Sequence, residues 1–235
     1  MNTSHEFHLM QLADSFFPAG MFSMSGGLES LVVHKKIQTP SEVLKFIKEQ
    51  IEFQLVPCDC RVLIITMNNV KKNQLLEVIQ IDKKYFSMKL AKEIRNSSVR
   101  SGKQVFNCLK HMVKDNNDKN DFIVKFQEKI ELKETPCTYP VALGIAVIYL
   151  QIPMQSVMRM LLYSFSSSVV SAAIRLGIIQ HLDGQKILFS LAKTVDEIII
   201  HNNVDFTTKD IWQLTPFTEI HQMEHEHHDS RMFIT

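Results

Sequence analysis

The residues best suited to chemistry lie in one short run, His221-Gln-Met-Glu-His225-Glu-His227-His228-Asp. This run contains four histidines and three acids within nine residues. On a helix His221 and His225 share one face, and His228 follows three residues later. Neutral imidazoles are good ligands for Ni²⁺, Zn²⁺ and Cu²⁺, so His221, His225 and His228 form a candidate metal site. There are two alternatives: a solvated tail that binds metal only weakly, and a tail that docks on a partner.

A cluster of glycines is the second unusual feature. Three of the seven glycines, Gly20, Gly26 and Gly27, fall within eight residues, in an apolar stretch that includes Pro18. Glycine permits a positive φ and close approach of another backbone, and proline fixes its own φ. The cluster predicts either a tight connection between helices or a surface that another molecule approaches closely. It is not a phosphate-binding loop, because Leu and Glu follow the last glycine where such a loop needs Lys and Ser or Thr.

Other patterns of catalysis are missing from the sequence. Neither Gly-x-Ser-x-Gly nor His-Glu-x-x-His occurs. Cys58 and Cys60 could supply two soft metal ligands, but two ligands do not close a site, so a pair of packed cysteines is expected. We therefore predict a protein that is not an enzyme. The alternative, a metal-dependent enzyme built on the histidine run, would need a third fixed ligand and a general base.

Positive charge is concentrated in one part of the chain. Residues 71–114 contain eleven Lys and Arg against three acids, although the net charge of the whole chain is only +1. Such a stretch indicates a solvated helix face, an acidic protein partner or a nucleic acid. No aromatic interleaving suggests base stacking and no known nucleic-acid module is present, so we rank a protein partner first. A basic helical nucleic-acid-binding module remains an alternative.

Composition sets broad limits. The chain has 235 residues, of which 45% are hydrophobic and 22% charged, enough for a globular core. With four cysteines and no signal peptide at the N-terminus, a reduced cytoplasmic protein is expected. The apolar stretches 141–150 and 161–174 are too short or too interrupted by serine to span a membrane, and we expect them to be buried helices.

Helices must position these residues. Thr39, Pro40 and Glu42 form a helix start, and apolar residues follow at helical spacing. Similar signals predict helices over 75–86, 88–113, 138–151, 153–178 and 183–201, with a short one from Pro216. No segment alternates with a period of two. The predicted fold class is therefore all-α, a single-domain bundle of roughly ten helices, with a linker at 115–121. Small residues at 164–173 predict close packing within the core or self-association.

Five segments in order resemble the UreF family of urease accessory proteins. Residues 11–29 resemble its Pro-x-Gly-x-Phe-Ser-x-Ser-x-Gly-Leu-Glu signature, and residues 93–102 its Glu-x-Arg…Ser…Gly helix. The further matches are an apolar helix start at 139–144, the Val-Arg-Leu…Gly-Gln region at 173–185, and the His-Glu-x-x-x-Ser-Arg-Leu-Phe ending at 225–235. Met24 and Met232 replace a tyrosine and a leucine common in the family, and both replacements are apolar.

The resemblance implies a non-enzymatic helical protein, without an intrinsic cofactor, that forms a homodimer in the cytoplasm. It would bridge the GTPase UreG and a second accessory protein, UreD (also called UreH), in the complex that delivers Ni²⁺ to apo-urease. Residues 1–235 would form one domain with a flexible N-terminus. A tail of about 222–235 would become ordered on docking to UreD. Neither a membrane nor a nucleic acid is implied as a partner.

The resemblance also implies a set of partner-binding residues in the glycine loop, one helix and the tail. They are Pro18, Gly20, Phe22, Ser25, Gly27, Glu29, Arg175, His225, Glu226, Ser230, Arg231 and Phe233. Arg231 would anchor the tail to the partner or to the chain's own core, with Phe233 beside it. Arg175 would satisfy helix carbonyls or line a passage for nickel. Glu93 and Arg95 are expected to pair within their own helix.

Overall fold

The computed structural model describes residues 4–18, 24–113, 121–200, 210–227 and 231–234, which form helices and turns and contain no strand. In chain order the helices are α1 (Ser4–Ala13), α2 (Leu28–Val33), α3 (Pro40–Gln50), η2 (Ile51–Cys60), α4 (Arg61–Lys71), α5 (Leu75–Met88), α6 (Lys92–Met112), α7 (Asp121–Glu131), α8 (Tyr139–Tyr149), α9 (Met154–Arg175), α10 (His181–Ile200) and α11 (Pro216–His225). The predicted all-α bundle of roughly ten helices is confirmed. Most of the expected linker at 115–121 lies outside the described residues.

The start of α3 follows directly from its sequence. The Glu42 amide donates to the Thr39 hydroxyl, and the Thr39 amide donates to the Glu42 carboxylate, so the two residues form a capping box. From there α3, η2 and α4 run on as one continuous helix, although Pro57 lies inside η2. Proline has no amide hydrogen for the helical ladder, and the wider π-helical turns of η2 accommodate it.

Pro57 also affects the segment that precedes α11. In an α-helix the amide of residue 57 would donate a hydrogen bond to the carbonyl of Phe53, and proline has no such amide hydrogen. Here the Leu214 amide donates to the Phe53 carbonyl at 2.8 Å, and the Trp212 amide donates to the Pro57 carbonyl at 3.2 Å. Backbone hydrogen bonds along η2 therefore fix the chain that leads into α11.

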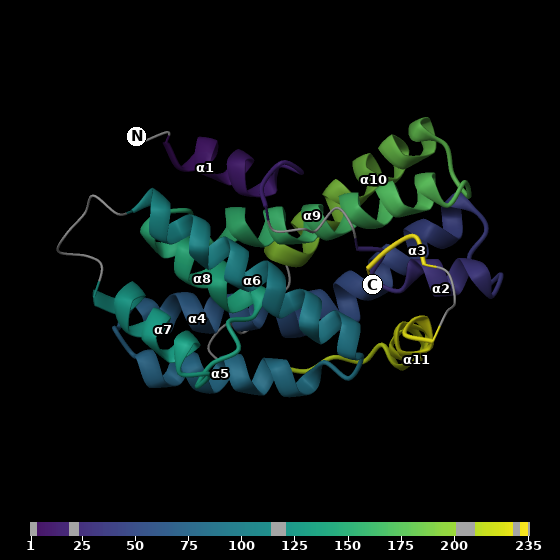
Figure 1. The fold of residues 1–235 in the computed structure, drawn as a ribbon. Coiled ribbons are helices and arrows are strands. Elements are labelled where there is room, and N and C mark those ends of the chain that lie inside the picture. The colour runs from purple at the N-terminus through teal and green to yellow at the C-terminus, as the bar shows by residue number, and fades with distance from the viewer. Residues whose placement is uncertain (1–3, 19–23, 114–120, 201–209, 228–230, 235) are drawn as a thin grey trace.

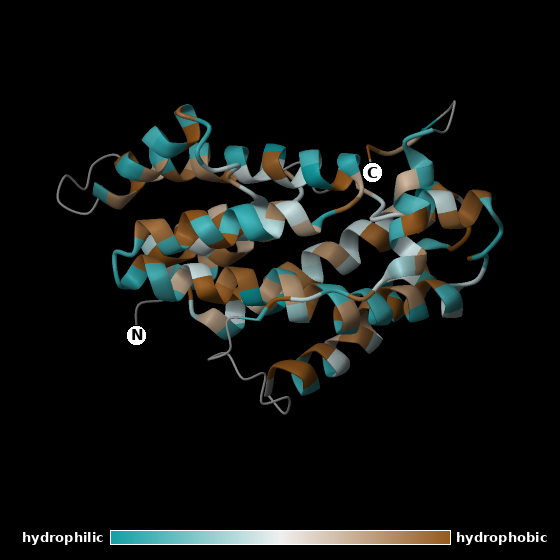
Figure 2. Cartoon of the chain, turned by 90° about the horizontal axis from the view of Figure 1, so that it is seen from below, coloured by the Kyte–Doolittle hydropathy of each residue, from teal (hydrophilic) through white to brown (hydrophobic). Residues whose placement is uncertain are grey.

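Two hydrophobic clusters form the core. One packs α2, α3, α9 and α10 together, and the other packs α5, α6 and α7. Helices α4 and α8 contribute to both clusters. Helix α8 is apolar on all sides, as expected for a helix surrounded by others, and Figure 2 shows hydrophobic residues concentrated along the central helices.

Two glycines allow the close packing around α8. A Cβ added at Gly102 of α6 would lie 2.1 Å from the carbonyl oxygen of Cys137, just before α8. A Cβ at Gly144 of α8 would lie 2.9 Å from Cβ of Thr66 in α4. Both glycines therefore permit a separation between chain segments that a larger residue would prevent.

Helix α9 is the one described helix long and apolar enough to cross a membrane, but 61% of its most apolar window is buried inside the bundle. It packs against α1, α2 and α10 (Figure 1). Ser166, Ser168, Ala172 and Ala173 are buried within the chain, whereas Ser164, Ser167 and Ser171 are half-buried. Residues 161–174 therefore lie in a mostly buried helix, as expected, and self-association through its half-buried serines stays a prediction.

Candidate functional site at the C-terminal junction

The glycine loop is approached closely from two sides by its own chain. Gly26 and Gly27 have φ values of 66° and 98°, a region that favours glycine. A Cβ at Gly27 would lie 2.9 Å from Cγ of Gln222 in α11, and a Cβ at Gly26 would lie 3.1 Å from the ring of Phe165 in α9. The described part of the loop is therefore shaped for contact with α9 and α11.

Side chains from these two helices also satisfy the loop backbone. Gln222 Nε2 donates to the Gly26 carbonyl at 2.9 Å, and Ser168 Oγ donates to the Met24 carbonyl at 2.7 Å. Ser25 is fully buried, and its hydroxyl accepts from the Glu29 amide. Buried backbone groups need such partners, so the loop depends on α11 being in place.

Glu29, in the first turn of α2, receives the C-terminal segment. The residue is only 5% exposed. It accepts hydrogen bonds from the backbone amides of Met232 at 2.7 Å and Phe233 at 3.1 Å. Hydrogen bonds to an ionised carboxylate are stronger than neutral ones, and they compensate for its burial. Residues 232–233 are thus bound to α2 through their backbone.

His225, at the end of α11, lies between two carboxylates and is 1% exposed. Its Nε2 is 3.0 Å from Oε2 of Glu29, and its Nδ1 is 2.7 Å from Oε2 of Glu93 in α6. A carboxylate only accepts, and an imidazole donates to both only when it carries two protons. His225 therefore connects α2, α6 and α11 at one point.

Two arginines complete the arrangement. Nη1 of Arg231 contacts Oε1 of Glu93. The guanidinium carbon of Arg175, in α9, lies 4.1 Å from the centre of the buried Phe233 ring, a cation–π contact. Burial lowers the pKa of Arg175, and the charge of Glu29 opposes this. We name the group of Glu29, Glu93, Arg175, His225, Arg231 and Phe233 the C-terminal junction.

Glu226 extends the junction by capping another helix. Its carboxylate accepts from the amides of Lys92 at 2.6 Å and Glu93 at 3.2 Å, at the start of α6. The first amides of a helix have no partner within the helix and favour an acidic acceptor. Because α6 has no side-chain hydrogen bond from its own N-cap residue, a residue 134 positions away supplies this acceptor.

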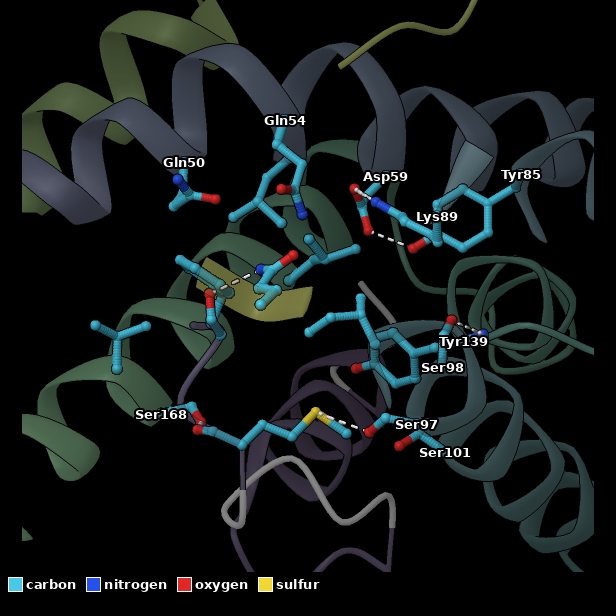
Figure 3. Close-up of a pocket in the computed structure, with 18 residues that line it drawn as sticks. Gln50, Gln54, Asp59, Tyr85, Lys89, Ser97, Ser98, Ser101, Tyr139 and Ser168 are labelled. Carbon is cyan, nitrogen blue, oxygen red and sulfur yellow. Dashed lines mark hydrogen bonds and ion pairs between the residues drawn. The ribbon is translucent and has the colours of Figure 1, made fainter. Parts of the chain in front are cut away.

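A cavity of about 100 Å³ adjoins the glycine loop, with Met24, Gly26 and Gln222 among its lining residues. Figure 3 shows Gln50 and Gln54 on one side of it, and Ser97, Ser101 and Ser168 on the other. The cavity therefore shares its walls with the loop and with α11, and polar side chains face it from several helices.

One wall of the cavity holds a buried ionic group. Asp59 of η2 accepts from the Tyr85 hydroxyl at 2.6 Å and from Nζ of Lys89 at 3.1 Å. Burial lowers the pKa of Lys89 but the charge of Asp59 raises it, and the net effect is a raised pKa. Burial raises the pKa of Tyr85 well above its ordinary value, and Asp59 adds to this. Lys89 is therefore a cation and Tyr85 a neutral donor at neutral pH.

The structure gives different neighbours to two of the three histidines predicted as a metal site, His221, His225 and His228, and metal binding by the three stays a prediction. His225 is enclosed in the junction, where both ring nitrogens face carboxylates. His221 instead has its Nδ1 2.7 Å from Oε2 of Glu224, and its ring centre lies 5.1 Å from that of His34. His228 lies outside the described residues. The helical spacing was right, but packing of α11 gives each of the first two histidines different neighbours.

The other predicted site residues fall into three groups. Gly20, Phe22 and Ser230 lie outside the described residues. Ser25, Gly27, Glu29, His225 and Phe233 are buried, and Glu226 is half-buried. Pro18, Arg175 and Arg231 are exposed. Of the two alternatives for Arg231, the structure shows the contact with the chain itself. Contact of these residues with a partner stays a prediction.

The structure revises the expected pairing of Glu93 and places part of the predicted tail. Glu93 does not pair within its helix, because its carboxylate contacts His225 and Arg231, while Arg95 donates to the Lys89 carbonyl at 3.0 Å. In the tail of 222–235, α11 extends to His225 and residues 231–234 are placed against the chain itself. Their ordering by a partner stays a prediction.

Sequence reasoning missed Asp59, Lys89 and Gln222. Asp59 carried a signal, because it is the one acid in the apolar run from Leu55 to Val62. Lys89 carried no signal, because nothing in the sequence distinguishes it from the other basic residues of 71–114. Only the structure shows that it is buried. Gln222 gave no signal beyond its place next to His221.

Comparisons with known proteins match most of this chain. A family model described as UreF matches residues 37–192. The chain is 29% identical over 222 residues to "Urease accessory protein UreF" of Trichodesmium erythraeum, which covers 94% of this chain and 93% of that protein. It is 28% identical over 232 residues to "Urease accessory protein UreF 1" of Brucella melitensis, which covers 97% of this chain and 91% of that protein.

Proposed function

Because this chain belongs to the UreF family of urease accessory proteins, which are chaperone-type proteins rather than enzymes, we propose that it acts as an adaptor in urease maturation. In this proposal it bridges the GTPase UreG and the accessory protein UreD/UreH. The assembly delivers Ni²⁺, as cargo, to apo-urease in the cytoplasm. The chain itself acts as a homodimer.

The observation that carries the proposal is a row of exposed apolar side chains on α11. Phe217, Ile220 and Met223 are spaced three residues apart, so they follow one another along one side of α11, and all three are exposed. Further exposed apolar side chains in this part of the chain are Trp212, Leu214, Met232 and Ile234. An exposed group of large apolar side chains supports a protein–protein contact.

The opposite side of α11 explains how such a surface can be presented. Thr218, Gln222 and His225 are buried against the rest of the chain. Gln50 Nε2 donates to the Thr218 hydroxyl at 2.8 Å, and Gln222 and His225 make the contacts described above. Helix α11 is thus bound on one side and apolar on the other, which supports docking of UreD/UreH on its exposed side.

Co-purification with UreD/UreH and UreG, followed by mass determination of the complex, tests the adaptor role. We expect a complex that contains two copies of this chain and both partners. A monomer that binds neither partner would contradict the proposal.

A charged substitution locates the docking surface. Phe217 is 55% exposed, so F217D should fold normally but lose UreD/UreH by at least about tenfold in affinity, since large aromatic side chains are frequent binding hot spots. L76D is the matched control, because Leu76 on α5 is also exposed. Equal retention of UreD/UreH by F217D and L76D would rule out this surface.

A further inference from the structure

Two histidines and a carboxylate meet where α2 and α11 come together. One potential ligand atom from each of His34, His221 and Glu224 lies within 4.8 Å of the other two. His34 is the residue that ends α2, whereas His221 and Glu224 are on α11. None of the three belongs to the C-terminal junction or to the cavity, and the adaptor role makes no use of them.

The orientation of His34 suits metal binding. Its Nδ1 is 2.8 Å from the backbone carbonyl oxygen of Ser30. Because a carbonyl only accepts, Nδ1 carries the proton and the lone pair is on Nε2. Metal-binding histidines commonly donate from one ring nitrogen to a backbone carbonyl in this way, which fixes the tautomer and the ring orientation.

His221 is held in place by its surroundings. Its buried ring packs edge-on against Phe217, with ring centres 4.7 Å apart, and its Nδ1 faces Glu224. Ligand atoms around a tetrahedral metal with bonds of about 2.1 Å lie about 3.4 Å apart. Separations of up to 4.8 Å therefore close with a small movement of His34 and Glu224, which are exposed and able to move toward the buried histidine.

We propose that His34, His221 and Glu224 bind a divalent first-row transition-metal ion that ties α11 to α2. Two imidazoles and one carboxylate suit Ni²⁺ and Zn²⁺, and three protein ligands leave coordination positions for water or for a donor from another protein. The site goes beyond the adaptor role and does not depend on it. Because His221 is on the same helix as the exposed apolar surface, bound metal would also stabilise the placement of that surface.

Calorimetric titration of the full chain with Ni²⁺, and separately with Zn²⁺, tests the site. We expect the site to bind one equivalent of metal ion per chain. In H34Q the affinity for this metal ion should fall by about tenfold or more. His34 is exposed, so H34Q should keep its fold, as circular dichroism would verify. The matched control is H181Q, at an exposed histidine that begins α10, and it should bind as the unmodified chain does.

His227 and His228 are the competing source of metal binding, and a double variant tests them. H227Q/H228Q removes both imidazoles and should still bind the one equivalent of metal that depends on His34. If H34Q binds as tightly as the unmodified chain, or if the unmodified chain binds no metal, the proposal is overturned. A second readout is thermal unfolding. Metal should raise the midpoint of the unmodified chain and of H181Q but not of H34Q, because only a folded-state site stabilises the fold.

Discussion

Glu29 and His225 are 196 positions apart in the sequence, yet Oε2 of Glu29 lies 3.0 Å from Nε2 of His225. The same carboxylate accepts the backbone amides of Met232 and Phe233. One side chain in the first turn of α2 therefore holds both the last described helix and the residues that follow it.

Substitution of Glu29 by Gln should release residues 231–234. The amide side chain keeps one acceptor oxygen but places an NH₂ group against donors, and the loss of charge-assisted hydrogen bonds should lower the free energy of unfolding by about 2 kcal/mol. Hydrogen exchange at the Met232 and Phe233 amides measures the effect. E52Q, at an exposed position in η2, is the control. Unchanged exchange in E29Q would show that these amides do not depend on Glu29.

The separation of α6 from the segment before α8 should be sensitive to one methyl group. G102A places a Cβ where the Cys137 carbonyl oxygen lies 2.1 Å away. Overpacking of this kind costs about 1–3 kcal/mol or more, because backbone must move. G177A is the comparison, since Gly177 has a positive φ of 75° but open space around it, and should cost about 1 kcal/mol. Urea unfolding compares the two, and equal destabilisation would contradict the packing argument.

Removal of Lys89 alone should be more harmful than removal of the whole pair with Asp59. K89M leaves a buried carboxylate without its cation and should cost about 3–5 kcal/mol, whereas K89M/D59N removes both charges. A double-mutant cycle of unfolding free energies gives the coupling between them. Strictly additive effects would mean that the two charges do not interact.

Alkaline pH should weaken this pair. Burial lowers the pKa of Lys89, but the charge and hydrogen bond of Asp59, together with Cys58 and Glu219, outweigh burial and raise this pKa above its ordinary value of 10.5. The stabilisation is fully present below pH 10.5 and is lost as the pH rises through the folded-state pKa. The unfolding free energy of the unmodified chain should therefore fall more steeply above this pH than that of K89M. Tyr85 still titrates in both proteins, so parallel pH profiles would contradict the role of Lys89.

Thiol labelling should distinguish the cysteines. Burial raises the pKa of Cys58 to about 12, and it also raises the pKa values of Cys60 and Cys137, all three of which are buried. Thiolate is the reactive form, so iodoacetamide at pH 8 should label the native chain mainly at half-buried Cys108. Mass spectrometry identifies the labelled residues, and urea should expose all four. Rapid native labelling of Cys58 would contradict its burial.

The parts of the fold that depend on neighbouring residues were predictable from the sequence. The capping box at Thr39 and Glu42, the proline that begins α11 and the serine-interrupted apolar helix α9 each follow from side chains within a few positions of one another. The predicted helix at 88–113 begins later, at Lys92, because the chain between α5 and α6 is extended at Lys89 and Ala91. Propensity alone does not locate such a break.

The site could be predicted only in part. The resemblance placed Glu29, His225 and Phe233 among twelve partner-binding residues, but it did not show that Glu29 contacts the other two within the chain. Their pairing joins segments that local patterns do not relate, as does the capping of α6 by Glu226. Helical periodicity placed His221 and His225 on one face, yet which neighbour each meets depends on how α11 packs against α2 and α6.

The dependence of Glu29 on residues 232 and 233 has a consequence for protein synthesis. Met232 is added 203 positions after Glu29, which at about 5–20 residues per second is roughly 10–40 s later. During that interval the Glu29 carboxylate lacks the amide donors of Met232 and Phe233, and the first amides of α6 lack the Glu226 carboxylate as acceptor. Folding around Glu29 and at the start of α6 can therefore finish only after residues 226–233 leave the ribosome. A chain that terminates before these residues would expose the Glu29 carboxylate without its amide donors.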